Sequence, residues 1–182
     1  MTWTKASLAL SLALVPGVVM AQSGGNAAPK SGDMAVSASL GFARAFDSDF
    51  DGIEAVFDGS FEYHTSDRIS WRGMLGTTSF DADGFPGEVD VNFFNANFIW
   101  SWHSENLRPY VTGGIGLYDV DLDVPGFNGN GDVEIGLNGG GGVDIYFNPH
   151  WAIEIEGLFH GFDGDDGPDT FFAATVGAKY KF

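Results

Sequence analysis

The segment IEAVFDGSFEYH, residues 53–64, alternates between bulky apolar and mostly polar side chains. An alternation with a period of two predicts a β-strand whose two faces meet different surroundings. One face carries Ile53, Ala55, Phe57, Gly59, Phe61 and Tyr63, and the other carries Glu54, Val56, Asp58, Ser60, Glu62 and His64. After a short connection at 65–67, the segment RISWRGML (68–75) alternates again. Together the two segments predict an antiparallel hairpin.

The same pattern continues outward from this hairpin in both directions and is broken at intervals by turn residues. Most of the expected strands reach the roughly 9–11 residues with which a tilted strand crosses a bilayer. Their ranges are 34–45, 53–64, 68–80, 88–103, 108–119, 133–147, 151–162 and 170–182. The pattern therefore predicts an all-β fold, an eight-stranded antiparallel transmembrane β-barrel.

Two kinds of connection alternate along the chain. The tight connections are 65–67, 104–107 and 148–150. The longer ones, rich in Asp and Gly, are 47–52, 81–87, 121–132 and 163–169. Outer-membrane barrels have short periplasmic turns and longer loops outside the cell. We therefore expect the long connections on the outside and both chain termini on the periplasmic side.

Composition indicates which face of each strand turns inward. The apolar face carries large aromatic residues and no charge over its middle, whereas the opposite face mixes charges with glycines. A soluble ligand-binding barrel would place the apolar face inside, so lipid outside and a polar interior is the better interpretation. In the range 88–103 the alternation changes parity at Phe93–Phe94, which predicts a β-bulge there.

The N-terminal residues have the features of an export signal. Lys5 supplies a positive charge, and an apolar run of 14 residues follows from Ala6 to Val19. This run is too short to span a bilayer as a helix, and Ala21 ends a small-residue cleavage site. We expect a signal peptide at 1–21, a flexible leader at 22–32, and an outer-membrane β-barrel domain at 33–182.

Charge and composition exclude several classes of function. The net charge of −17 makes nucleic acid an improbable partner, because the phosphate backbone would be repelled. The absence of cysteine excludes disulfides, thiolate metal sites and a lipidated cysteine after the signal. We expect a monomer in the outer membrane of a Gram-negative cell, with outer-membrane lipid and lipopolysaccharide as partners.

Tryptophan supports the orientation of the barrel. The four tryptophans after the signal segment all lie within five residues of a tight connection, and they are Trp71, Trp100, Trp102 and Trp151. An aromatic girdle at one membrane interface would concentrate them in this way. The alternative is a β-sandwich in which the four are ordinary core residues.

Two segments carry a resemblance to a known family. The chain ends ATVGAKYKF (174–182), and its apolar residues alternate back from Phe182 through Tyr180. This resembles the C-terminal assembly signal of bacterial outer-membrane barrels. RPYVTGGIGLY (108–118) resembles a strand of small OmpA/OmpX-like and opacity-type barrels. The resemblance implies insertion by the barrel-assembly machinery and brings no catalytic residue or cofactor. We expect no periplasmic domain after Phe182.

One strand register predicts ion pairs inside the barrel. If the turn centres on Thr65, Glu62 lies opposite Arg68, and Asp58 lies opposite Arg72, all on the inward face. The pairs are interpreted either as the lining of a selective pore or as a packed polar core, since an eight-stranded interior is wide enough only for its own side chains. By parity the inward acids outnumber the inward cations. The acids are Glu54, Asp58, Glu62, Glu134, Asp144, Glu154 and Glu156, and the cations are Arg68, Arg72, Lys179 and Lys181. The excess acids must therefore be hydrated, protonated or bound to cations.

The first long connection contains a partial calcium motif. Asp47, Asp49 and Asp51 precede Gly52 as in a D-x-D-x-D-G loop, with Asp58 at the twelfth position. The alternative interpretation is an ordinary hairpin loop, in which Asp and Gly are also common residues. More generally, the acidic long connections would either gather divalent cations or be solvated carboxylates that keep the loops soluble.

The histidines leave metal binding and catalysis open as alternatives. His64, His103 and His150 lie near the tight connections, where they would bind a metal, respond to pH or act as interfacial polar residues. The sequence has no Gly-x-Ser-x-Gly, His-Glu-x-x-His or phosphate-loop motif. We therefore expect a non-enzymatic barrel with an envelope or surface-interaction role. A narrow porin-like channel is the second hypothesis, and an outer-membrane lipid-modifying enzyme is the third.

Overall fold

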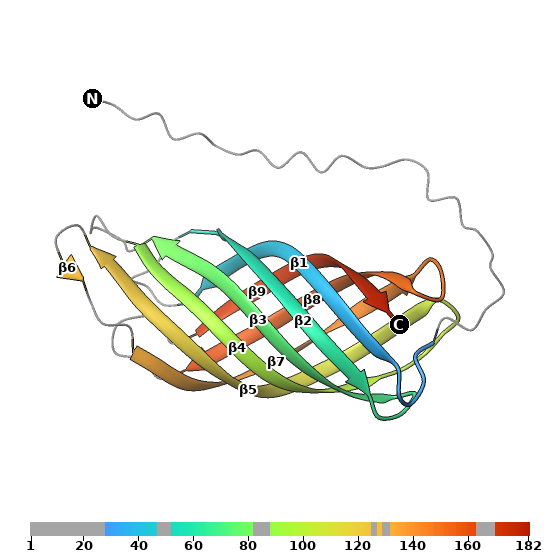
Figure 1. Ribbon diagram of the computed structural model, residues 1–182. Helices are drawn as coiled ribbons and strands as arrows, with labels where there is room; N and C mark the ends of the chain where they lie inside the picture. The colour runs from blue at the N-terminus through green and yellow to red at the C-terminus, as the bar shows by residue number, and fades with distance from the viewer. Residues whose placement is uncertain (1–27, 47–51, 82–87, 125–126, 129–131, 163–169) are drawn as a thin grey trace, which may run out of the picture.

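The chain forms a closed barrel of long antiparallel strands (Figure 1). The computed structural model describes residues 28–46, 52–81, 88–124, 127–128, 132–162 and 170–182. The strands are β1 (Met34–Ala45), β2 (Glu54–His64), β3 (Ile69–Asp81), β4 (Glu88–Ser101), β5 (Leu107–Val124), β6 (Phe127–Asn128), β7 (Asp132–Tyr146), β8 (Trp151–Phe162) and β9 (Thr170–Lys181). Within the described residues, no helix is long and apolar enough to cross a membrane.

Eight of these strands make the wall of the barrel, as the sequence predicts. Around the wall the order is β4-β3-β2-β1-β9-β8-β7-β5, and pairing between β4 and β5 closes it. The two-residue β6 pairs only with the last residues of β5. Because every wall strand has two hydrogen-bonded neighbours, closure removes the open edges that an unclosed sheet would leave to lipid.

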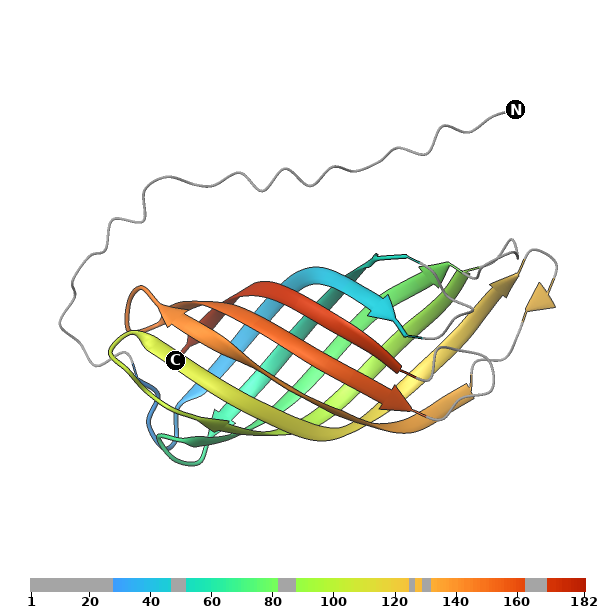
Figure 2. The same cartoon turned by 180° about the vertical axis from the view of Figure 1, so that it is seen from behind.

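Burial alternates along the strands with the predicted parity. In β8 every second residue from Ala152 to Phe162 is buried, and most of the residues between them are exposed. In β2 the outward residues include Phe57 and Phe61, while Glu62 and His64 are buried. Figure 2 shows the wall formed by β1, β9 and β8, with the C-terminus at the end where the tight connections lie. The predicted faces are confirmed for these strands.

The predicted bulge in β4 is wrong. The pairing of β3 with β4 runs without interruption from Ile69↔Trp100 to Asp81↔Glu88. Phe93 is buried and Phe94 is exposed, so the alternation does not change parity. The prediction failed because it took the whole interior to be polar, whereas apolar side chains fill the part near the long connections.

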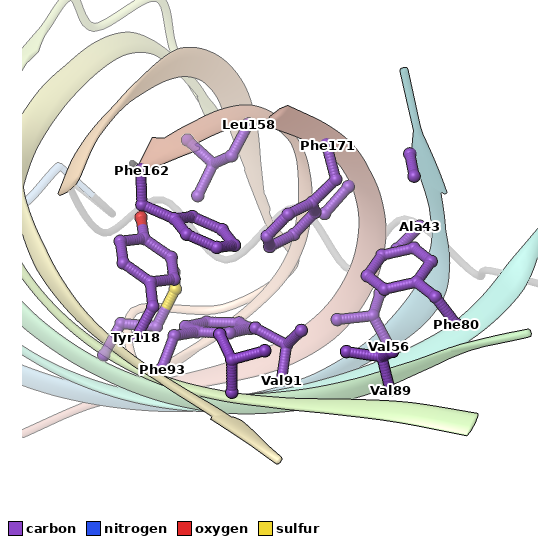
Figure 3. Packing of buried hydrophobic residues seen from close by; sticks show 14 residues of the cluster. Ala43, Val56, Phe80, Val89, Val91, Phe93, Tyr118, Leu158, Phe162 and Phe171 are labelled. Atoms are coloured by element: carbon purple, nitrogen blue, oxygen red, sulfur yellow. The ribbon is translucent and has the colours of Figure 1, made fainter. Parts of the chain in front are cut away.

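The apolar part of the interior is a cluster of aromatic and aliphatic side chains (Figure 3). The rings of Tyr118 and Phe162 stack at a centroid distance of 4.5 Å, and those of His160 and Phe171 stack at 4.4 Å. Gly76 makes room for Phe93, because a Cβ atom at position 76 would meet the Phe93 ring. We call this group the apolar cluster; it contains Ala43, Ala45, Val56, Met74, Phe80, Val89, Val91, Phe93, Tyr118, Val120, Leu158, Phe162, Phe171 and Ala173.

The register of the second hairpin differs from the prediction. Glu62 lies opposite Arg72, and Asp58 lies opposite Gly76. The cause is a wider turn, in which the Ser66 hydroxyl accepts hydrogen bonds from the backbone N–H groups of Arg68 and Ile69. These bonds hold Arg68 in the turn, outside β3. The shift is even, so the side chains within β2 and β3 keep their predicted faces, while Arg68 lies exposed in the turn.

The last residues before β1 lie against the end of the barrel with the tight connections. The backbone N–H of Gly32 donates to the carbonyl of His64 at 2.8 Å, and the Ser31 hydroxyl donates to the carbonyl of Thr65. Lys181 Nζ lies 3.4 Å from Asp33 Oδ2. The predicted signal peptide and most of the predicted leader lie outside the described residues.

Phe171→Ala should destabilise the barrel, since Phe171 is fully buried and packs against Phe80, Phe93, His160 and Phe162. Truncating it leaves a cavity at a cost of about 3–5 kcal/mol in the free energy of unfolding. Urea unfolding of the refolded protein in lipid bilayers measures the change. The matched control is Phe172→Ala in the same strand on the outward face. An equal loss for both variants would contradict the packed apolar cluster.

Candidate functional site: a buried charge cluster

Seven charged side chains from six strands meet inside the barrel, towards the tight connections. All seven are buried, with 5% exposure or less. We call this group the charge cluster; it comprises Glu62 of β2, Arg72 of β3, Arg108 of β5, Asp144 of β7, Glu154 and Glu156 of β8, and Lys179 of β9. Each occupies the inward position that the period of two assigns to it.

Arg108 joins β2 to β7 across the lumen. Its NH2 group lies 2.6 Å from Glu62 Oε1, and its NH1 group lies 2.8 Å from Asp144 Oδ2. The remaining donors bond to the hydroxyls of Ser70 at 3.0 Å and Ser101 at 3.1 Å. Every side-chain nitrogen of this guanidinium group therefore has an acceptor, as the burial of a charge requires.

Lys179 and Arg72 complete the cluster. Lys179 Nζ contacts the carboxylates of Glu62 at 3.1 Å, Asp144 at 3.0 Å and Glu154 at 2.5 Å. Arg72 bonds to Glu154 Oε1 at 3.1 Å and to Glu156 Oε2 at 2.6 Å. Most of these contacts link strands that are not neighbours in the wall, so the cluster holds opposite sides of the barrel together.

Tyr110 lies at the centre of the cluster. Its hydroxyl donates a hydrogen bond to Glu156 Oε2 at 2.7 Å. Arg72, Arg108 and Lys179 each place their charge within 6 Å of its ring centre, at 5.9, 5.7 and 5.6 Å. The ring face is the negative part of its quadrupole and attracts these cations. The four carboxylates of the cluster exceed its three cations by one, and the Tyr110 hydroxyl is an additional donor to them.

The predicted interior pairs need correction. Arg72 pairs with Glu154 and Glu156 of β8, across the lumen from β3, and not with Asp58. Arg68 is exposed in the turn, and Glu62 pairs with Arg108 and Lys179 instead. The prediction considered only residues opposite each other in one hairpin. In so narrow a lumen, long side chains reach strands on the far side.

Arg108 is the cluster residue that sequence reasoning missed. The sequence did hold an indication of its position. Arg108 and Tyr110 are two residues apart in the segment 108–118, so they lie on the same face of the strand. Asp58 does face inward but is only half-buried, opposite Gly76. Asp58, Glu156 and His160 border a void of about 10 Å³ between the charge cluster and the apolar cluster. A void of this size holds about one water molecule.

The four tryptophans lie on the outside of the barrel near the tight connections. All are exposed, and Trp100 and Trp102 contact each other at a ring distance of 4.9 Å. Trp71 packs edge-on against Phe98, and Trp151 packs against Tyr180. Tyr180 also stacks on Phe182 at 6.2 Å. These positions exclude the sandwich alternative, in which the tryptophans would be buried.

The histidines do not converge on a common site. His64 is buried, with Nε2 3.5 Å from Glu62 Oε1. Burial lowers the pKa of His103, whose Nε2 lies 2.6 Å from the Asp67 carbonyl oxygen. His150 Nδ1 lies 2.9 Å from the Lys181 carbonyl oxygen. Among the described residues, no three His, Cys, Asp or Glu side chains are placed to hold a metal ion. The predicted calcium ligands Asp47, Asp49 and Asp51 lie outside the described residues.

Arg72→Ala should lower the free energy of unfolding by about 3–5 kcal/mol, because it leaves Glu154 and Glu156 buried without their arginine partner. The measurement is urea unfolding in lipid bilayers. Arg68→Ala is the matched control, since Arg68 is exposed and should leave the unfolding midpoint unchanged. An effect of Arg68→Ala as large as that of Arg72→Ala would refute the observed register.

Solved structures share this fold at low sequence identity. Neisserial surface protein A (NspA) matches with a TM-score of 0.69 and 16% identity, over 83% of this chain and 99% of that chain. OprG from Pseudomonas aeruginosa matches with a TM-score of 0.68 and 15% identity, over 87% and 99%. The outer membrane enzyme PagL also matches, at a TM-score of 0.50 and 11% identity over 80% and 97%.

These likenesses establish the architecture, and they include proteins of different roles. No curated protein sequence matches the chain. The model of the family described as "Outer membrane protein beta-barrel domain" matches residues 7–182, nearly the whole chain. Together with the closed barrel of eight wall strands, this match shows that the chain belongs to the outer-membrane β-barrel domain family.

Proposed function

We propose that this protein is a non-enzymatic outer-membrane barrel with a structural or surface-interaction role in the cell envelope. The observation that carries the proposal is the filled lumen. The charge cluster occupies the part near the tight connections, and the apolar cluster occupies the part near the long ones. A lumen used for packing leaves the outer surface and the long connections as the places where partners bind.

The long connections are acidic and would face the exterior. Asp81, Asp83, Asp163 and Asp165 belong to the longer connections in the sequence, as do the three predicted calcium ligands in residues 47–51. Lipopolysaccharide phosphates carry the same sign of charge, so divalent cations would bridge protein and lipid. We include loose binding of divalent cations by these connections in the proposed role.

A narrow channel is the second candidate, and the buried charges favour it. Polar side chains in a lumen are the usual lining of an aqueous pore. Here, however, Arg72, Arg108 and Lys179 are each bound by carboxylates and are buried. A hydrated path would have to separate these pairs and also pass the stacked rings of the apolar cluster.

An outer-membrane lipid enzyme would need a nucleophile, a histidine and a carboxylate together near the long connections. At that end, the structure describes one histidine, His160, whose Nδ1 lies 3.0 Å from the Tyr118 hydroxyl inside the apolar cluster. The Ser79 hydroxyl bonds to Asp90, with no histidine among the described contacts of that pair. The enzyme hypothesis is therefore the weakest of the three.

Export and insertion form part of the proposal. The signal segment at 1–21 would direct the chain across the inner membrane, and the barrel-assembly machinery would read the last strand. In the structure the Phe182 side chain is exposed, while its backbone bonds to Met34 in both directions. The exposure of this ring supports a role in recognition, because packing inside the barrel does not require it.

The refolded protein should show no stepwise ion conductance in planar bilayers, because both clusters block the lumen. A variant with five substitutions serves as the comparison: Arg72→Ser, Glu154→Ser, Glu156→Ser, Phe93→Ala and Phe171→Ala. It removes side chains from both the charge cluster and the apolar cluster. Heat-modifiable mobility shows that each protein is folded before recording. Regular conductance steps from the unaltered protein would establish the channel hypothesis instead.

Phe182→Ser should reduce the amount of folded barrel in the outer membrane severalfold, while refolding of the purified variant into lipid remains close to normal. The reason is that the ring is expected to serve recognition more than packing, since it lies exposed. The readouts are heat-modifiable mobility in isolated outer membranes and refolding yield in vitro. Phe159→Ser, another exposed aromatic position, is the matched control. Normal assembly of Phe182→Ser in cells would disprove the recognition role.

A further inference from the structure

A shallow groove lies on the outside of the wall and is lined by residues of β2, β3, β4, β5 and β7. Figure 1 shows β2, β3, β4 and β5 on the side turned to the viewer. The volume of the groove is about 540 Å³, and the groove is open to the surroundings of the barrel. Five of its apolar side chains point away from the lumen and are 45–64% exposed; they are Phe57, Leu75, Phe94, Leu117 and Val133. Phe93, which is buried and belongs to the apolar cluster, also borders the groove. The surface is therefore hollowed where the family places membrane lipid.

A row of polar side chains crosses the same groove. Thr77, Asn92 and Asp119 lie opposite one another on β3, β4 and β5, and all three line the hollow. The row directly below it, towards the tight connections, is apolar and consists of Leu75, Phe94 and Leu117. One step nearer the long connections, the Ser79 hydroxyl bonds to Asp90. The groove thus spans the boundary between the apolar belt and the polar outer end of the wall.

This arrangement fits a ligand with an aliphatic chain and hydrogen-bond donors at the head of that chain. Asp119 offers only acceptors when it is ionised, and Asn92 and Thr77 each offer an acceptor as well. A phosphate group placed directly at this row would meet the negative charge of Asp119, so the row fits the hydrogen-bond donors of a lipid better than it fits a phosphate. Amide N–H and hydroxyl groups close to an acyl chain meet the row favourably, and these groups occur where acyl chains join the sugars of lipopolysaccharide.

We propose that the groove binds one acyl chain of an outer-leaflet lipopolysaccharide molecule, with Thr77, Asn92 and Asp119 accepting hydrogen bonds from the amide and hydroxyl groups at the head of that chain. The site depends on membership of the outer-membrane family and is independent of whether the lumen conducts. The proposed site places the lipid specificity of the protein on the side of the barrel formed by β2, β3, β4, β5 and β7. The wall made by β1, β8 and β9 has apolar Val176 and Ile155 side by side on its outer face.

Native mass spectrometry can measure binding of rough lipopolysaccharide to the full, refolded chain released from mixed micelles. Thr77→Trp fills the groove and should raise the dissociation constant about tenfold. Val176→Trp adds an equally large ring at an exposed apolar position of the opposite wall and should change it by less than about twofold. Heat-modifiable mobility and the urea midpoint identify any variant that fails to fold.

A second variant tests the polar row without adding bulk. Asn92→Leu with Asp119→Leu should abolish the preference for lipopolysaccharide over phosphatidylglycerol, whose chains lack amide donors, while retaining chain binding. Equal binding by Thr77→Trp and Val176→Trp would overturn the site. An unchanged preference in the double leucine variant would overturn the assignment of the headgroup. Neither result depends on conductance, so failure of this site and failure of the proposed function are distinguishable.

Discussion

The interior of a closed eight-stranded barrel has room for its own side chains and little else, and this limit governs the rest of the molecule. Seven charges brought into that space would each carry a large desolvation penalty alone. They are tolerated because Arg108, Lys179 and Arg72 divide four carboxylates among them, with Tyr110 contacting all three cations. The ion pairs within the cluster therefore offset the desolvation penalty of each buried charge.

The interior is divided into two layers of different chemistry. Near the tight connections the charge cluster makes directional contacts that specify which strands face each other across the lumen. Near the long connections, rings such as Phe93, Tyr118 and Phe171 fill space through packing. Directional bonds give specificity and apolar packing gives stability, so the two layers complement each other. Between them, the described void has room for about one water molecule.

Parity could be predicted from the sequence because a β-strand repeats every two residues whatever its register. The strands and most of their faces followed from segments such as 53–64. Register could not be predicted, since a shift by an even number leaves every face unchanged, and only the Ser66 contacts in the turn reveal the wider turn. The partners of Arg72 were missed for a related reason, because contacts across a lumen leave no trace in the alternation of one hairpin. The bulge at Phe93–Phe94 was predicted because Phe93, which belongs to the apolar layer of the interior, was taken to face lipid.

Substitutions inside the lumen and substitutions on the outer face of the barrel differ in what they disturb. A change inside the lumen disturbs paired charges or packed rings, so it is costly in stability. A change on the outer face, such as at Thr77 or Asn92, alters only contacts with lipid or neighbours. New specificity can therefore arise on the wall and in the long connections while the interior stays constant. The wall that carries the groove combines exposed apolar side chains with a polar row, so it offers a lipid two kinds of contact while the lumen stays filled.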